Sequence, residues 1–180
     1  MPTQPIYMDN SATSFPKPPA VLDAITHYAT HIGASAGRGA YRQAIESGKV
    51  IHHCRQQLAR LLNAPAPEQI IFTLNCTDGL NIAIHGLLKP GDHAITTAMD
   101  HNSVLRPLNH LKANRNVDVT FVPVDPATTL VDPADIEAAL KPNTRLILVV
   151  HGSNVHGSPQ TIDQTTAPAR KHPNPCVLHR

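Results

Sequence analysis

Residues 145–150 read Arg145-Leu146-Ile147-Leu148-Val149-Val150 and contain the longest uninterrupted apolar run of the chain. Side chains along a strand point alternately to opposite faces, so a strand that is apolar at successive positions is covered on both faces. The run therefore predicts a strand in the middle of a mostly parallel sheet with flanking helices. It is far shorter than the ~20 residues that a membrane-spanning helix needs, so we expect no membrane association.

Outward from this strand, helical and strand patterns alternate along the chain. Short apolar or β-branched runs predict further strands over residues 68–74, 93–98 and 117–124. Apolar residues at helical spacing lie between them, and Asp132-Pro133 has the form of a helix N-cap followed by proline in the first turn. Alternation of this kind is typical of the α/β class with a parallel sheet.

Two helices are predicted before the first of these strands. One begins at Pro19 and ends at Gly33, a residue suited to terminating a helix. The other, of about twenty residues, ends before Pro65. We expect its buried stripe to comprise Ile45, Ile51, Leu58, Leu61 and Leu62.

The composition excludes several classes of protein. The 180 residues are 41% hydrophobic and 16% charged, which describes a globular chain rather than a disordered one. The formal net charge of +2 is too small to indicate nucleic-acid binding. The N-terminus lacks the pattern of a secretory signal, and three widely spaced cysteines suit a reducing compartment, so we expect a cytoplasmic protein.

Three predicted strand ends carry polar residues, and ligands of open parallel sheets bind beyond the carboxyl ends of the strands. Cys76-Thr77-Asp78-Gly79 opens a helix whose free amides could hold a phosphate, although Thr77 or Asp78 could equally be a simple cap. His101 follows the second strand. Asn154 follows the fourth, between Gly152 and Gly157.

Several motifs resemble, in order and spacing, the first half of class V aminotransferases, above all the cysteine desulfurase and selenocysteine lyase branch. The resemblance covers roughly residues 6–172 and rests on the segments Asp9-Asn10-Ser11-Ala12-Thr13-Ser14-Phe15-Pro16-Lys17-Pro18, Gly37-Arg38-Gly39, Thr77-Asp78-Gly79-Leu80-Asn81, Pro90-Gly91-Asp92, Asp100-His101-Asn102-Ser103-Val104-Leu105-Arg106-Pro107 and Ser153-Asn154-Val155-His156-Gly157. It implies part of the large domain of a fold type I enzyme that depends on pyridoxal 5'-phosphate and acts on a small amino acid.

The resemblance also implies roles for individual residues. Cys76 and Thr77 occupy the phosphate-contacting turn, and Cys76 stands where relatives commonly have Thr or Ala, which leaves more of that role to Thr77. His101 matches the catalytic imidazole that stacks on the cofactor ring. Asn154 matches the amide that binds the phenolic oxygen of the ring.

Two parts of the family chemistry have no matching residue. These are the lysine that holds the cofactor covalently and the aspartate that pairs with the pyridine nitrogen. Lys171 lies in no matching segment, and residues 173–180 diverge where the aspartate is due. We therefore expect an arm over 1–18, a partial cofactor-binding large domain over 19–172 and a divergent tail over 173–180. The expected product is a truncated or frameshifted fragment without turnover. The family builds its site across a homodimer, and the sequence leaves the oligomeric state of this chain open.

Two other hypotheses stay open. The chain contains 12 histidines, and His52-His53-Cys54 together with His101, His110, His151 and His156 could indicate a metal-binding protein. Adjacent residues on a helix point about 100° apart, which argues against His52 and His53 as joint ligands. The main hypothesis assigns no metal ligand. The remaining alternative is an inert fragment, or one that pairs with a separately encoded second half.

Overall fold

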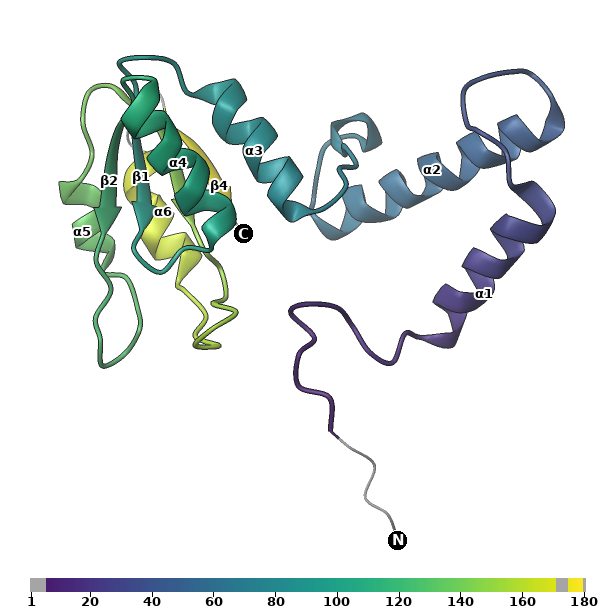
Figure 1. The fold of residues 1–180 in the computed structure, drawn as a ribbon, viewed down its shortest axis with the longest axis horizontal. Coiled ribbons are helices and arrows are strands. Elements are labelled where there is room, and N and C mark those ends of the chain that lie inside the picture. The colour runs from purple at the N-terminus through teal and green to yellow at the C-terminus, as the bar shows by residue number, and fades with distance from the viewer. Residues whose placement is uncertain (1–5, 171–174, 180) are drawn as a thin grey trace, which may run out of the picture. The chain divides into compact units, whose positions relative to one another are not determined.

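The computed structural model describes residues 6–170 and 175–179. The chain divides into two compact units, Met1–Phe72 and Thr73–Arg180, which we describe separately. Figure 1 shows helices in the first unit and a sheet with its helices in the second. The second unit carries all four expected site residues, Cys76, Thr77, His101 and Asn154.

The first unit contains helix α1 (Pro19–His27), which continues as the π-helical turn η1 (Tyr28–Ile32), and the long helix α2 (Arg42–Leu61). Gly33 ends the first helical segment with φ of 55°, a left-handed conformation that glycine adopts readily. The predicted start at Pro19, the end at Gly33 and the second helix of about twenty residues are thus confirmed. The unit closes with the 3₁₀ turn η2 (Pro67–Gln69).

The predicted buried stripe of α2 is wrong. Ile45 is 48% exposed, Leu61 77% and Leu62 66%, and the residues that α2 buries are Ala44, Ser47 and Ala59. Helix α2 packs on η1 and η2, and small side chains allow this close approach. Helical spacing identified the helix but not the face that meets its neighbours.

The second unit has the order α3 (Cys76–Leu87), β1 (His93–Thr97), α4 (Asn102–Asn114), β2 (Asp118–Val122), α5 (Pro133–Ala138), β3 (Thr144–Val149), α6 (Ile162–Arg170) and β4 (Cys176–His179). The strands form one sheet in the order β2-β1-β3-β4, and every pair is parallel. The predicted α/β class with a parallel sheet is confirmed, and β3 lies inside the sheet as its apolar run predicts.

Alternate residues of the strands face two apolar clusters. Ala94, Leu146 and Leu148 face helices α3 and α4, where Ile84 and Leu108 are fully buried. Residues next to them in sequence, such as Ile147, face the other cluster with α5 and α6. The strand β3 is therefore apolar throughout because it is covered on both faces.

The predicted strand at 68–74 is not formed. Ile71 is 77% exposed and Leu74 93% exposed, and no described strand pairs with this segment. An extended segment becomes part of a sheet only through hydrogen bonds to a neighbouring strand.

Conversely, β4 was not predicted, and it lies within the segment expected to be a divergent tail. It pairs with β3 from Leu146↔Cys176 to Val149↔His179, and its Val177 and Leu178 pack against the two apolar clusters. Lys171, Pro173, Asn174 and Arg180, which also figure in the sequence predictions, lie outside the described residues.

Candidate functional site

Strands β1 and β3 bring two of the predicted site segments to one edge of the sheet. The strands are parallel neighbours paired as far as Thr96↔Leu148, so the segments that follow them leave the sheet at the same, carboxyl edge. His101 lies after β1 and Asn154 after β3. This is the edge at which open parallel sheets bind ligands.

His101 is the N-cap of α4, and its imidazole is held in place there. Nδ1 accepts a hydrogen bond from the backbone N–H of Ser103 at 3.0 Å and lies 2.8 Å from the Ser103 hydroxyl oxygen. An amide N–H only donates, so Nδ1 carries no proton, and the neutral ring has its proton on Nε2. The half-buried ring is thereby oriented before any ligand is present.

Asp100, the residue before His101, has a buried carboxyl group. Its Oδ2 accepts hydrogen bonds from the Thr97 hydroxyl at 2.7 Å, the Thr97 amide at 3.2 Å and the Thr96 hydroxyl at 3.1 Å. Its Oδ1 is buried and makes no hydrogen bond of ordinary geometry among the described residues. Burial raises the pKa of Asp100, against the hydrogen bonds from Thr97 and Thr96 and a lesser contribution from the Val150 backbone, which lower it.

Asn154 lies on a loop that is ordered from within. The buried Ser153 hydroxyl accepts hydrogen bonds from the amides of Val155 and His156, and Gly157 N–H donates to Ser153 C=O at 2.9 Å. Gly157 has φ of 73°, which a residue with a Cβ rarely adopts. The Asn154 side chain is exposed, so its amide is available to a ligand.

Gln160 braces the base of this loop and was not identified from the sequence. It is 4% exposed. Its side chain accepts from Val131 N–H at 2.9 Å and donates to Thr129 C=O at 2.9 Å and to the Met99 sulfur at 3.4 Å. A polar residue three positions after a glycine is too weak a pattern to indicate such a brace.

Cys76 and Thr77 begin helix α3 and are exposed. Asn75 caps the helix: its side chain accepts from the Asp78 amide at 2.9 Å, and its backbone C=O accepts from Gly79 N–H at 3.2 Å. The amides of Cys76 and Thr77 are the two remaining first-turn donors, which a helix cannot satisfy internally. The cap is therefore Asn75 and not Thr77 or Asp78, and phosphate binding by this turn stays a prediction.

Unlike the other two segments, this turn does not follow a strand of the sheet, because residues 68–74 are unpaired. Helix α3 packs on the sheet through Leu80 and Ile84 and leads through Leu88–Asp92 to the start of β1. The helix therefore runs toward the amino edge, and its first turn is at the end farther from that edge. The structure joins His101 and Asn154 through adjacent strands and leaves Cys76 and Thr77 on a separate element.

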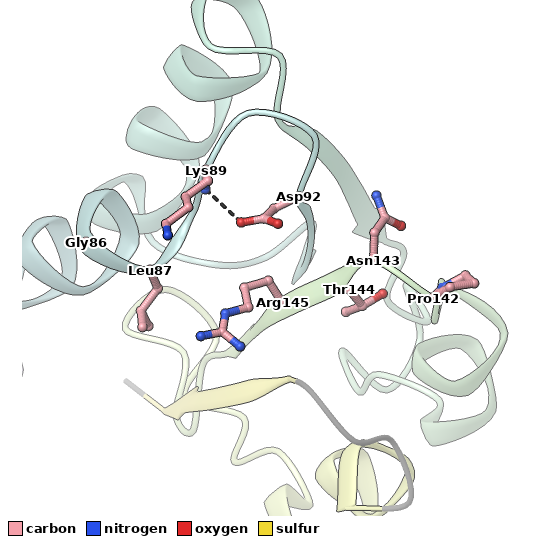
Figure 2. A pocket seen from close by; sticks show the side chains of 8 residues that line it. All are labelled: Gly86, Leu87, Lys89, Asp92, Pro142, Asn143, Thr144 and Arg145. Carbon is pink, nitrogen blue, oxygen red and sulfur yellow. Dashed lines mark hydrogen bonds between the residues drawn. The ribbon is translucent and has the colours of Figure 1, made fainter.

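A pocket lies at the opposite edge of the sheet. Figure 2 shows a pocket of about 480 Å³ lined by Gly86, Leu87, Lys89, Asp92, Pro142, Asn143, Thr144 and Arg145, with the Lys89 amide bonded to Asp92 Oδ2. Asp92 precedes β1 and Asn143 precedes β3, so this pocket is at the amino edge of the sheet. The carboxyl edge remains the candidate site.

Neither a metal centre nor a membrane span is found in the described part of the chain. No group of three or more His, Cys, Asp or Glu residues there is arranged to hold a metal ion. His52, His53 and Cys54 are exposed along α2, and His110 stacks edge-on with His85 at 6.4 Å between ring centroids. None of the described helices is long and apolar enough to cross a membrane.

A parallel α/β sheet with ordered polar groups at its carboxyl edge is typical of doubly wound domains that bind ligands there. The sequence model of the family described as aminotransferase class-V matches residues 6–179, beyond the range of the resemblance and into β4. The chain belongs to this family.

Several relatives that it matches are cysteine desulfurases or probable cysteine desulfurases. A probable cysteine desulfurase of Synechocystis sp. is 34% identical over 156 residues, covering 84% of this chain and 37% of the relative. The apo structure of cysteine desulfurase from Thermococcus onnurineus NA1 superimposes with a TM-score of 0.88 at 28% identity, covering 97% of this chain and 43% of that one.

A further solved relative shows the cofactor of the family. A variant of the protein C-DES, with glycine covalently linked to pyridoxal phosphate, has a TM-score of 0.76 at 26% identity, over 90% of this chain and 43% of that chain. Our chain thus spans less than half the length of each of these three relatives. The predicted family, branch and cofactor dependence of the relatives are confirmed.

Proposed function

We propose that this chain is the cofactor-binding first part of a pyridoxal-phosphate enzyme that releases sulfur from L-cysteine. The observation that carries the proposal is the arrangement at the carboxyl edge of the sheet. An oriented His101 and an exposed Asn154 follow adjacent strands there. The similarity to cysteine desulfurases supports cysteine as the substrate. We further propose the division into an arm (1–18), a partial large domain (19–172) and a tail (173–180).

The described residues fit the cofactor. The amides of Cys76 and Thr77 and the Thr77 hydroxyl form a donor set for a phosphate at the start of a twelve-residue helix. Asn154 supplies an amide donor for an oxygen on the ring, and His101 holds a proton at Nε2 facing away from its cap. The cofactor, when bound, supplies an electron sink for the bonds of the amino-acid substrate.

We also propose that the 180-residue chain has no turnover by itself. No lysine stands at the family's position for covalent attachment, and no carboxylate stands where the pyridine nitrogen would need one. Three exposed, unpaired cysteines support our placement of the protein in the reducing cytoplasm. Homodimerisation, which the family implies, is part of the same proposal.

Pyridoxine 5'-phosphate is a suitable probe of binding because it lacks the aldehyde and cannot react with surface lysines. Equilibrium dialysis should show saturable binding that inorganic phosphate reduces. Thr77→Val should weaken binding by roughly tenfold, the loss expected for one hydrogen bond to a charged group. Thr128→Val, the same change on an exposed loop, is the matched control.

The absence of turnover has its own test. Pyridoxal phosphate and cysteine are added to the purified chain, sulfide is measured, and the protein is reduced with borohydride. We expect no sulfide and no stoichiometric adduct at one lysine. Sulfide release together with such an adduct would overturn the expectation of inactivity, and an absence of saturable probe binding would overturn the cofactor assignment.

A further inference from the structure

The Asp100 carboxyl group closes the turn between β1 and the site. Thr97 N–H donates to Asp100 Oδ2 at 3.2 Å, while Asp100 N–H donates to Thr97 C=O at the same distance. The Thr97 and Thr96 hydroxyls add two further bonds, and both threonines are fully buried at the end of β1. The backbone of Asp100 is therefore tied to the last residues of the strand.

The orientation of His101 depends on this turn. His101 is bonded covalently to Asp100, and its ring is fixed on the other side by the Ser103 amide at the start of α4. Ser103 is 4% exposed, so its amide has little access to water as an alternative acceptor. A displacement of the turn would carry the imidazole away from this amide and weaken the bond that orients the ring.

Asp125 also closes a turn, but it lies outside the candidate site, so it serves as a comparison for Asp100. Its Oδ1 accepts from Ala127 N–H at 2.8 Å, its Oδ2 accepts from the Thr128 hydroxyl at 3.0 Å, and it is exposed. Asp100 differs, since it is 5% exposed and its Oδ1 makes no hydrogen bond of ordinary geometry in the described structure. Burying a carboxyl group is costly, so closing a turn does not by itself account for this residue.

We propose that Asp100 is a positioning residue that sets the location and ring orientation of His101 through the three hydrogen bonds that its Oδ2 accepts. The significance of the oriented imidazole rests on the proposed function, but the positioning itself does not.

The test uses the whole isotopically labelled chain without cofactor and reads His101 directly by NMR. In the wild type, the His101 ring should show one protonated and one unprotonated nitrogen, and the Ser103 amide should exchange slowly. In Asp100→Ala, we expect the ring signals of His101 to shift and Ser103 exchange to be about tenfold faster, the loss of one ordinary hydrogen bond. Asp100→Asn keeps an acceptor oxygen and should stay within about twofold of the wild type.

Asp125→Ala is the matched control, because it opens a turn of the same kind away from His101 and should leave both signals unchanged. If Asp100→Ala loses exchange protection throughout β3, Thr97→Val decides instead, since it removes only the 2.7 Å bond and should accelerate Ser103 exchange several-fold.

Wild-type ring signals and Ser103 protection in a folded Asp100→Ala variant would overturn the proposal, as would an equal effect of Asp125→Ala. Where Thr97→Val is the deciding variant, unchanged Ser103 exchange would likewise overturn it. Failure of pyridoxine phosphate to bind would instead refute the proposed function and leave this inference standing.

Discussion

Replacing Gln160 with leucine should destabilise the sheet-containing unit by about 2–3 kcal/mol, mainly through the amide of Val131. Val131 is 3% exposed, and its N–H donates to Gln160 Oε1 at 2.9 Å, so leucine leaves a buried donor without a partner. An orphaned buried backbone group costs roughly 1–3 kcal/mol.

The second lost bond contributes less. The Thr129 carbonyl, which accepts from Gln160 Nε2, belongs to a half-buried residue, so water can replace part of this bond. Thr129 has φ of 57°, a left-handed conformation that costs a non-glycine residue roughly 1–2 kcal/mol, and the bond helps to hold it there. The Met99 sulfur is a weak acceptor and adds little. The similar volume of leucine limits any cavity.

The choice of assay follows from the composition. The chain has no tryptophan, and Tyr7, Tyr28 and Tyr41 all belong to the first unit, so intrinsic fluorescence does not report on the sheet. Urea unfolding should therefore be followed through the amide signals of β1 and β3. Gln164→Leu, at an exposed position of α6, is the matched control. A Gln160→Leu destabilisation below about 0.5 kcal/mol, or one no larger than that of the control, would refute the reasoning.

Three further predictions concern the same unit. Burial lowers the pKa of His93, so on acidification the unfolded chain takes up a proton at a higher pH than the folded chain does. The free energy of unfolding should therefore fall as the pH drops below about 6.5, more steeply than in His93→Gln. Equal pH dependence of the two proteins would contradict this. Asn75→Ala removes the cap of α3 and should cost about 1 kcal/mol in urea unfolding and weaken pyridoxine phosphate binding; unchanged values for both would count against the capped donor set. Leu108→Ala should lower the free energy of unfolding by about 2–5 kcal/mol because the side chain is fully buried. Ile82→Ala, at a 61% exposed position, should lower it by only about 0.5 kcal/mol. Similar losses in the two variants would show that Leu108 is not a core residue.

Most of the sheet could be predicted from the sequence because its signals are local. The apolar run at Leu146–Val150 and the alternation around it indicated three of the four strands and the helices between them. The cap at Asp132 is confirmed by its bond from the Ala134 amide at 2.8 Å. Propensity and periodicity act within a few residues, so a single chain displays them.

The errors involve pairing between distant segments. Residues 68–74 have the composition of a strand but no described neighbour to bond with, whereas Cys176–His179 has little pattern and forms β4 because the edge of β3 is open to it. Strand formation depends on an available partner as much as on side chains. The stripe of α2 was misplaced for a related reason, since only contacts decide which helical face is buried.

For the site, the sequence by itself determined the residue types: a hydroxyl and free amides at a helix start, an imidazole after one strand and an amide after another. Only the tertiary structure decided that β1 and β3 are neighbours, that Ser103 leaves the proton of His101 on Nε2, and that Asp100 and Gln160 are buried behind the site. The physical reason is that burial and hydrogen-bond partnership are properties of spatial neighbours. Asp100 and Asp125 both close turns. Packing leaves Asp125 exposed with both carboxyl oxygens hydrogen-bonded, whereas it buries Asp100, whose Oδ1 makes no hydrogen bond of ordinary geometry.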